Sequence, residues 1–145
     1  MEFMPASAVK LALLDMAGGI RASSRREYPT LGTGEHRAEQ RTEDWIDAIG
    51  KAADDLLGEA GAEAMGKVAA IGLSAQMPTM VIVDKKGRSY KNAVVWSDCR
   101  AQGVAEKLLA RFGAARHYER TGVVLDGHRR YARAEGLPSY ADSYR

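Results

Sequence analysis

The chain has 145 residues, of which 46% are hydrophobic and 28% charged, a length and composition that fit one globular domain. The formal net charge of +2 gives no electrostatic case for nucleic acid, and no apolar run approaches the roughly 20 residues of a membrane helix, so neither partner is expected. The single cysteine, Cys99, cannot form an internal disulfide, which suits the reducing cytoplasm.

Two short runs open the chain. Val9–Asp15 is apolar and stops at the glycine-containing stretch 16–19, after which Ile20–Tyr28 follows. This pattern predicts a strand, a glycine turn and a second strand. Residues 30–41 are mostly polar, contain glycine and are expected to form a loop.

A helix is predicted next. Thr42 is the expected N-cap, because its hydroxyl can accept a hydrogen bond from a free amide of the first turn. Gly58 and Gly61 are expected to end the helix. Between Thr42 and Gly58, apolar residues recur at helical spacing: Trp45, Ile46, Ile49, Ala52, Ala53, Leu56 and Leu57.

The middle of the chain predicts further strands. Lys67–Ser74 is almost continuously apolar, which is typical of a strand buried on both faces inside an α/β sheet. Residues 79–96 predict a hairpin with its turn at Gly87. Together with the opening strands, these elements predict an α/β fold with a mixed sheet and flanking helices.

Two helices are expected toward the end. Asp98 is a candidate cap for a helix whose apolar face runs to Phe112 and which Gly113 stops. A shorter helical segment covers Ala114–Arg120. From Arg129 onward large aliphatic residues are scarce, which predicts a loosely packed tail.

Five segments are informative when taken in order: Val9–Asp15, Glu39–Gln40, Ala70–Met77, Val95–Arg100 and Tyr118–Gly122. Together they resemble the N-terminal domain of the FGGY carbohydrate kinases, and resemble xylulokinase most. The resemblance implies a ribonuclease H-like (actin-like ATPase) domain, duplicated in the full enzyme and incomplete here, over residues 8–128, with an atypical tail at 129–145. The tail departs from the family pattern, and a truncation or a frame change near His128 would explain the departure.

The resemblance implies phosphorylation of a sugar hydroxyl by ATP, with Mg²⁺. The catalytic aspartate and most of the adenine site would lie in the second copy of the fold, so no catalytic residue is assigned to this chain. We therefore expect the chain to be inactive alone. Two alternatives stay open. One is a half-enzyme that needs a separate C-terminal kinase domain or a homodimer, and the other is a non-enzymatic sugar-binding or regulatory module.

The resemblance also implies a sugar-facing loop after the apolar run 67–74. Gln76, Met77 and Pro78 stand where xylulokinases usually carry Gln-Met-His within Gly-Gln-Met-His-Gly. Because the histidine is replaced, the identity of the sugar stays open. The alternative reading is an ordinary loop with a proline-set turn, in which the methionine fills the core.

A second candidate element is Trp96, Asp98 and Arg100. These residues alternate, so on an extended strand they would point to one side. Asp98 would then accept a hydrogen bond from a sugar hydroxyl, and Trp96 would supply an apolar wall. In the alternative reading Asp98 caps a helix, Arg100 pairs with it and Trp96 belongs to the core.

The nucleotide side departs from the family. Members open with Asp-x-Gly-Thr-x-Ser, whereas Phe3 and Pro5 occupy the aspartate and glycine positions here. Proline has no amide to donate to a phosphate. Ser7 and Lys10 are left as weak candidates for phosphate contact. The histidines match no metal template, so no metal site is expected.

Overall fold

The structure is a computed structural model, and it describes residues 8–32 and 36–126. The chain divides into two compact units, each of which is described by itself. The first unit consists of Met1–Thr30 and Gln40–Gln76, and the second of Leu31–Glu39 and Met77–Arg145. The tail predicted at 129–145 lies outside the described residues.

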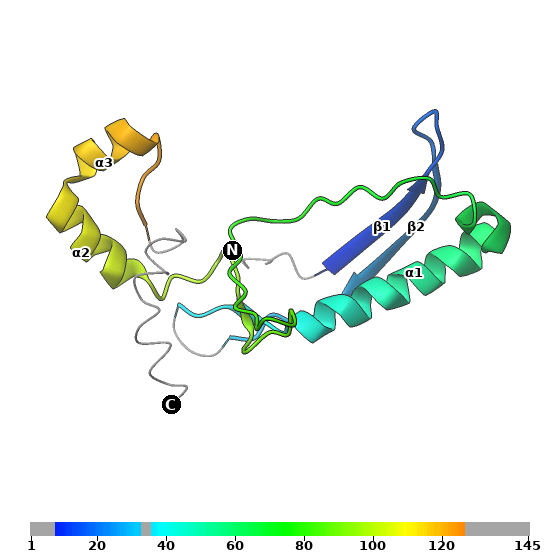
Figure 1. Ribbon diagram of the computed structural model, residues 1–145, viewed down its shortest axis with the longest axis horizontal. Helices are drawn as coiled ribbons and strands as arrows, with labels where there is room; N and C mark the ends of the chain where they lie inside the picture. Colours follow the sequence, from blue (N-terminus) through cyan, green and yellow to red (C-terminus); the bar gives the residue numbers. More distant parts are fainter. Residues whose placement is uncertain (1–7, 33–35, 127–145) are drawn as a thin grey trace. The chain divides into compact units, whose positions relative to one another are not determined.

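The first unit opens with an antiparallel hairpin (Figure 1), formed by β1 (Ala8–Leu14) and β2 (Ile20–Glu27). The carboxylate of Asp15 organises the turn, because its Oδ1 accepts hydrogen bonds from the amides of Ala17 and Gly19 at 2.9 and 2.8 Å. Gly18 has a φ of 82°, which a residue without Cβ adopts at little cost. The predicted strand, glycine turn and strand are confirmed.

Helix α1 (Thr42–Met65) packs along this hairpin (Figure 1). Its buried residues are Ala48, Ala52 and Leu56, which are four positions apart and therefore share one face of the helix. They lie in the same unit as the buried Ala22 of β2. Two of the three are alanines, which are small enough for the helix to pack closely on a sheet.

The bounds of α1 differ from the prediction. Its N-cap is Arg41, which makes no side-chain capping bond, and Thr42 is already helical. The prediction of Thr42 as the N-cap is therefore wrong. Gly58 lies within the helix, because an isolated glycine lowers helix stability without forcing a break. Gly61 does interrupt it, with φ 81° and ψ 156°.

The apolar run Lys67–Ser74 is not a strand, which corrects the prediction. Ile71 and Leu73 are 92% and 91% exposed. The backbone of residues 69–79 forms no hydrogen bond with any other described residue. A strand requires a partner edge for its amides and carbonyls, and no described strand supplies one. The described strands form two two-stranded sheets, so the expected mixed sheet is absent from this part of the chain.

The second unit contains the predicted turn at Gly87. The amide of Gly87 donates to the carbonyl of Asp84 at 3.0 Å, and the Asp84 amide donates to the carbonyl of Arg88 at 2.8 Å. The hairpin around this turn is held by isolated bridges, Met80 with Val94 among them. The regular strands of the second small sheet are short: β3 (Glu39–Gln40) and β4 (Ala93–Val94).

The second unit continues with α2 (Gln102–Phe112) and α3 (Ala114–Thr121), which are in contact. Gly113 joins them with a φ of 82°, so its predicted role as a helix stop is confirmed. The core beside α2 is a cluster of Ala101, Ala105 and Leu125. Within the described residues, no helix has both the length and the apolar character needed to cross a membrane.

Candidate functional site

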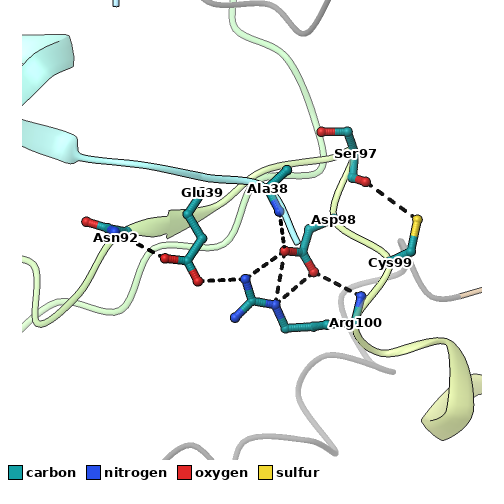
Figure 2. Close-up of polar contacts among 7 residues, drawn as sticks. All are labelled: Ala38, Glu39, Asn92, Ser97, Asp98, Cys99 and Arg100. Carbon is teal, nitrogen blue, oxygen red and sulfur yellow. Dashed lines mark hydrogen bonds and ion pairs between the residues drawn. The ribbon is translucent and has the colours of Figure 1, made fainter. Parts of the chain in front are cut away.

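A buried polar cluster lies where the segment after β4 meets the residues around β3 in the second unit (Figure 2). It consists of the side chains of Glu39, Asn92, Asp98 and Arg100 and the amide of Ala38, and it is called here the Arg100 cluster. It joins stretches of chain that are more than fifty positions apart in the sequence.

Asp98 is the most buried member, with 0% exposure. Nε of Arg100 donates to both carboxylate oxygens of Asp98 at 2.9 and 3.0 Å, and Nη2 donates to Oδ2 at 2.7 Å. The Arg100 amide donates to Oδ1 at 3.0 Å and the Ala38 amide to Oδ2 at 2.8 Å. Both oxygens of the carboxylate therefore have several donors, as a buried charge requires.

Glu39 completes the cluster on the other side of the guanidinium (Figure 2). Nη2 of Arg100 donates to Oε1 of Glu39 at 2.6 Å, and Nδ2 of Asn92 donates to Oε2 at 3.1 Å. The side chains of Arg100 and Glu39 are 17% and 12% exposed, so both ion pairs are largely shielded from solvent. A planar guanidinium with several N–H donors suits such a two-sided contact.

Burial and pairing oppose one another in setting the charges of the cluster. Burial raises the pKa of Asp98, but hydrogen bonds from the Arg100 side chain and from the Ala38 and Arg100 amides outweigh it and hold that pKa below its ordinary value. Burial likewise lowers the pKa of Arg100, whereas hydrogen bonds to Asp98 and Glu39 raise it well above normal. Asp98 is thus a carboxylate and Arg100 a cation at neutral pH.

The cluster joins distant segments through a fixed arrangement of charges. One guanidinium lies between two carboxylates, and each charge is hydrogen-bonded. No group of three or more histidine, cysteine, aspartate or glutamate residues that could hold a metal ion occurs among the described residues. Because the Asp98 carboxylate also accepts from the amide of Ala38, the arrangement is suited to orienting that backbone segment.

The structure brings Asp98 and Arg100 together, as the alternative reading of this element expected. The expectation that Asp98 caps the following helix is wrong, since Ala101 occupies the N-cap of α2. The extended alternation is also wrong, because the chain turns at Trp96 and Ser97 and the Asp98 amide donates to the Val95 carbonyl at 3.0 Å. Trp96 itself is half-buried.

The predicted sugar-facing loop spans the division between the two units. Gln76 belongs to the first unit, and Met77 and Pro78 belong to the second. Met77 is 86% exposed, so it does not fill a core as the alternative reading expected. The Met77–Pro78 peptide bond is cis. Contact of these residues with a sugar stays a prediction.

On the nucleotide side, Ser7 lies outside the described residues, and Lys10 is exposed on β1.

Sequence reasoning missed two members of the Arg100 cluster. It cited Glu39 for family resemblance alone, and it did not single out Asn92. Residues 30–41 were expected to form a loop, but Glu39 and Gln40 form β3 and are both buried, so the local pattern held no usable signal for Glu39.

Comparison with known proteins identifies the family of this chain. Residues 4–130 match the N-terminal domain of the FGGY family of carbohydrate kinases. A glycerol kinase of Bordetella pertussis is 36% identical over 121 residues, which are 80% of this chain and 23% of that protein. A xylulose kinase of Bacillus subtilis is 28% identical over 107 residues, 74% of this chain and 21% of that protein.

A solved structure supports the fold. The xylulose kinase of Rhodospirillum rubrum superimposes with a TM-score of 0.86 at 18% identity, covering 94% of this chain and 28% of that one. The chain spans about a quarter of the length of the curated relatives that it matches. The match over residues 4–130 shows that this chain belongs to the FGGY family of carbohydrate kinases and corresponds to the N-terminal domain.

Proposed function

We propose that this chain is the sugar-facing part of an FGGY carbohydrate kinase, which phosphorylates a hydroxyl of a small sugar or polyol with ATP and Mg²⁺. The observation that carries the proposal is the family match over residues 4–130. Relatives named glycerol kinase and xylulose kinase support a polyol or ketopentose as the substrate class. Residues 8–128 would form the domain, and such an enzyme would act in the cytoplasm.

Phosphoryl transfer requires an oriented acceptor hydroxyl, neutralised phosphate charge and a base. We assign the first task to this chain. Gln76, Met77, Pro78 and Trp96 are the proposed sugar-facing residues, and the high exposure of Met77 is compatible with contact to a ligand. Asp98 and Arg100 belong to the proposed site through the Arg100 cluster. The complete burial of the Asp98 carboxylate favours a supporting role over direct sugar contact.

No Mg²⁺–ATP site is assigned to the described residues. They contain no group of three or more metal-ligating side chains, and Lys10 stands exposed on β1. In the proposed enzyme the catalytic base and the nucleotide site belong to the C-terminal domain.

One observation favours the alternative of a half-enzyme that works with a separate C-terminal domain or a second copy. The segment 69–79 leaves its backbone unbonded among the described residues and exposes Ile71 and Leu73 almost completely. Such a segment gains hydrogen bonds and apolar burial when another protein surface covers it.

The test is an ATP-consumption assay over a panel of pentoses and polyols, with and without an added C-terminal kinase domain. We expect turnover with the added domain and none without it. Gln76→Ala should lower kcat/KM, whereas Gln102→Ala, which alters an exposed glutamine on α2, should not. Absence of turnover with every acceptor and added domain would count against the kinase assignment.

Calorimetric titration with D-xylulose, D-ribulose and glycerol in the absence of ATP provides a second measurement. The proposal predicts weak or undetectable binding by the chain alone, because one wall of the pocket is supplied by another domain. Micromolar binding without ATP, combined with no turnover in the first assay, would support a non-enzymatic sugar-binding module instead.

A further inference from the structure

We propose that Arg100 is a positioning residue that anchors the sugar-facing loop at Met80, and this inference rests on the proposed function. Arg100 does not contact the loop itself in this scheme. Its effect is transmitted through a series of hydrogen bonds that begins at the Asp98 carboxylate and ends at the backbone of Met80, two residues after Pro78. This series is called the path below. All the bonds in this path lie within the second unit.

The first part of the path fixes Ala38. The Ala38 amide donates to Oδ2 of Asp98 at 2.8 Å, and the Ala38 carbonyl accepts from the Val95 amide at 3.2 Å. Ala38 is therefore held at both of its backbone polar groups. Val95 is 0% exposed, so its position is also restrained by packing.

The second part of the path reaches the loop. Val94, next to Val95, exchanges two hydrogen bonds with Met80: each amide donates to the carbonyl of the other at 2.9 Å. Residues 69–79 form no backbone hydrogen bond with any described residue. Met80 is thus the first backbone anchor after the loop, and the direction in which Pro78 leaves it depends on where Val94 sits.

The path depends on Arg100 because of charge. Without the guanidinium, the carboxylates of Asp98 and Glu39 would be buried near one another with no cation between them, which is strongly unfavourable. Asp98 would then protonate or move, and the Ala38 amide would lose its acceptor. Lysine keeps the charge but lacks the planar fork, so it should restore the path in part.

Amide hydrogen exchange in the 145-residue chain tests this inference. In Arg100→Met we expect the Met80 and Val94 amides to exchange about tenfold faster or more, with a smaller effect in Arg100→Lys. The Gly87 amide at the hairpin turn and the amides of β1 should keep their rates. Arg88→Met, which removes an exposed ion pair with Asp84, is the matched control and should leave Met80 and Val94 unchanged.

Two results would overturn the inference. One is an unchanged rate at Met80 and Val94 while the Ala38 amide accelerates. The other is an acceleration at Met80 and Val94 in both Arg100 variants that is no larger than that of the amides of α2 and α3, which indicates a loss of overall stability without a local path. If Arg100→Met does not fold, Arg100→Lys and Glu39→Gln carry the same comparison.

Sugar kinetics separate this inference from the proposed function. In the assay with an added C-terminal domain, Arg100→Lys should raise KM for the sugar severalfold with little change in kcat, because it shifts the loop and touches no reacting atom. If the wild-type chain shows no turnover with the added domain, the proposed function fails. The exchange result still decides whether Arg100 acts on Met80 through the path. An exchange effect without a KM effect would overturn the link between Arg100 and the sugar.

Discussion

Nη2 of Arg100 donates to Oε1 of Glu39 at 2.6 Å, although these residues are 61 positions apart in the sequence. Their pairing thus depends on the tertiary structure of the second unit. The same nitrogen also donates to Oδ2 of Asp98 at 2.7 Å, so one group bridges two carboxylates. Charge removal at this point should affect stability far more than removal of a surface ion pair.

Arg100→Met should lower the free energy of unfolding of the second unit by about 3 kcal/mol, because it leaves buried carboxylates without their cation. Urea unfolding followed by the NMR signal of Val95 would measure this. Arg21→Met is the control. Arg21 is 68% exposed in its pair with Asp15, and its loss should cost about 0–1 kcal/mol. Equal losses in the two variants would contradict the assigned burial of the cluster.

The pKa of Asp98 predicts how the stability of the fold depends on pH. Its pKa is lower in the folded chain than the ordinary value of 3.8. The ionised group therefore stabilises the fold above pH 3.8, and this contribution is lost as the pH falls through the folded pKa. The Ala38 amide shift, which reports on Asp98 directly, should titrate with a midpoint below 3.8, and Asp98→Asn should abolish the step. A midpoint above 3.8 would contradict the prediction.

Two glycines of α1 should respond in opposite ways to the same substitution. Gly61 has φ 81° and ψ 156°, a conformation that residues with a Cβ adopt at a cost of about 1–3 kcal/mol, so Gly61→Ala should destabilise the first unit. Gly58 is helical, and a Cβ there meets no atom within 4 Å. Gly58→Ala should stabilise by roughly 0.5–1 kcal/mol. Thermal unfolding of both variants checks the pair, and effects of the same sign would refute the break at Gly61.

The burial of Gln40 predicts that removing its side-chain amide lowers the free energy of unfolding. It is 1% exposed, its Nε2 donates to the Thr30 hydroxyl at 2.8 Å, and its Oε1 accepts from Nε1 of Trp45 at 3.1 Å. Gln40→Met keeps the volume but removes both bonds, so it should cost about 1–3 kcal/mol in urea unfolding. Gln102→Met, at an exposed site on α2, should be close to neutral.

Local signals in the sequence predicted the elements that local chemistry determines. The turn at Gly18, the turn at Gly87 and the helix stop at Gly113 were all placed correctly, since each uses a glycine with a positive φ. The pairing of Asp98 with Arg100 was also anticipated as one of two readings. Two residues apart, these side chains are close by covalent connection alone.

The largest errors concern features that depend on distant partners, although two local predictions, the helix caps at Thr42 and Asp98, were also wrong. The run 67–74 has the composition of a buried strand, but composition does not supply an adjacent edge, and the segment is exposed. The contacts of Asp98 with Ala38 and of Arg100 with Glu39 span about sixty positions, so no periodicity could reveal them. Hydrogen bonds between segments this far apart can be identified only in the folded structure.

The second unit is discontinuous, since it takes Leu31–Glu39 from the middle of the first. A recombinant piece beginning at Met77 would retain Asp98 and Arg100 but lack Ala38 and Glu39. Its guanidinium would keep one carboxylate of its two, and Asp98 would lose an amide donor. A piece that contains the whole second unit therefore requires residues 31–39 to be joined to the segment that begins at Met77, for instance by circular permutation.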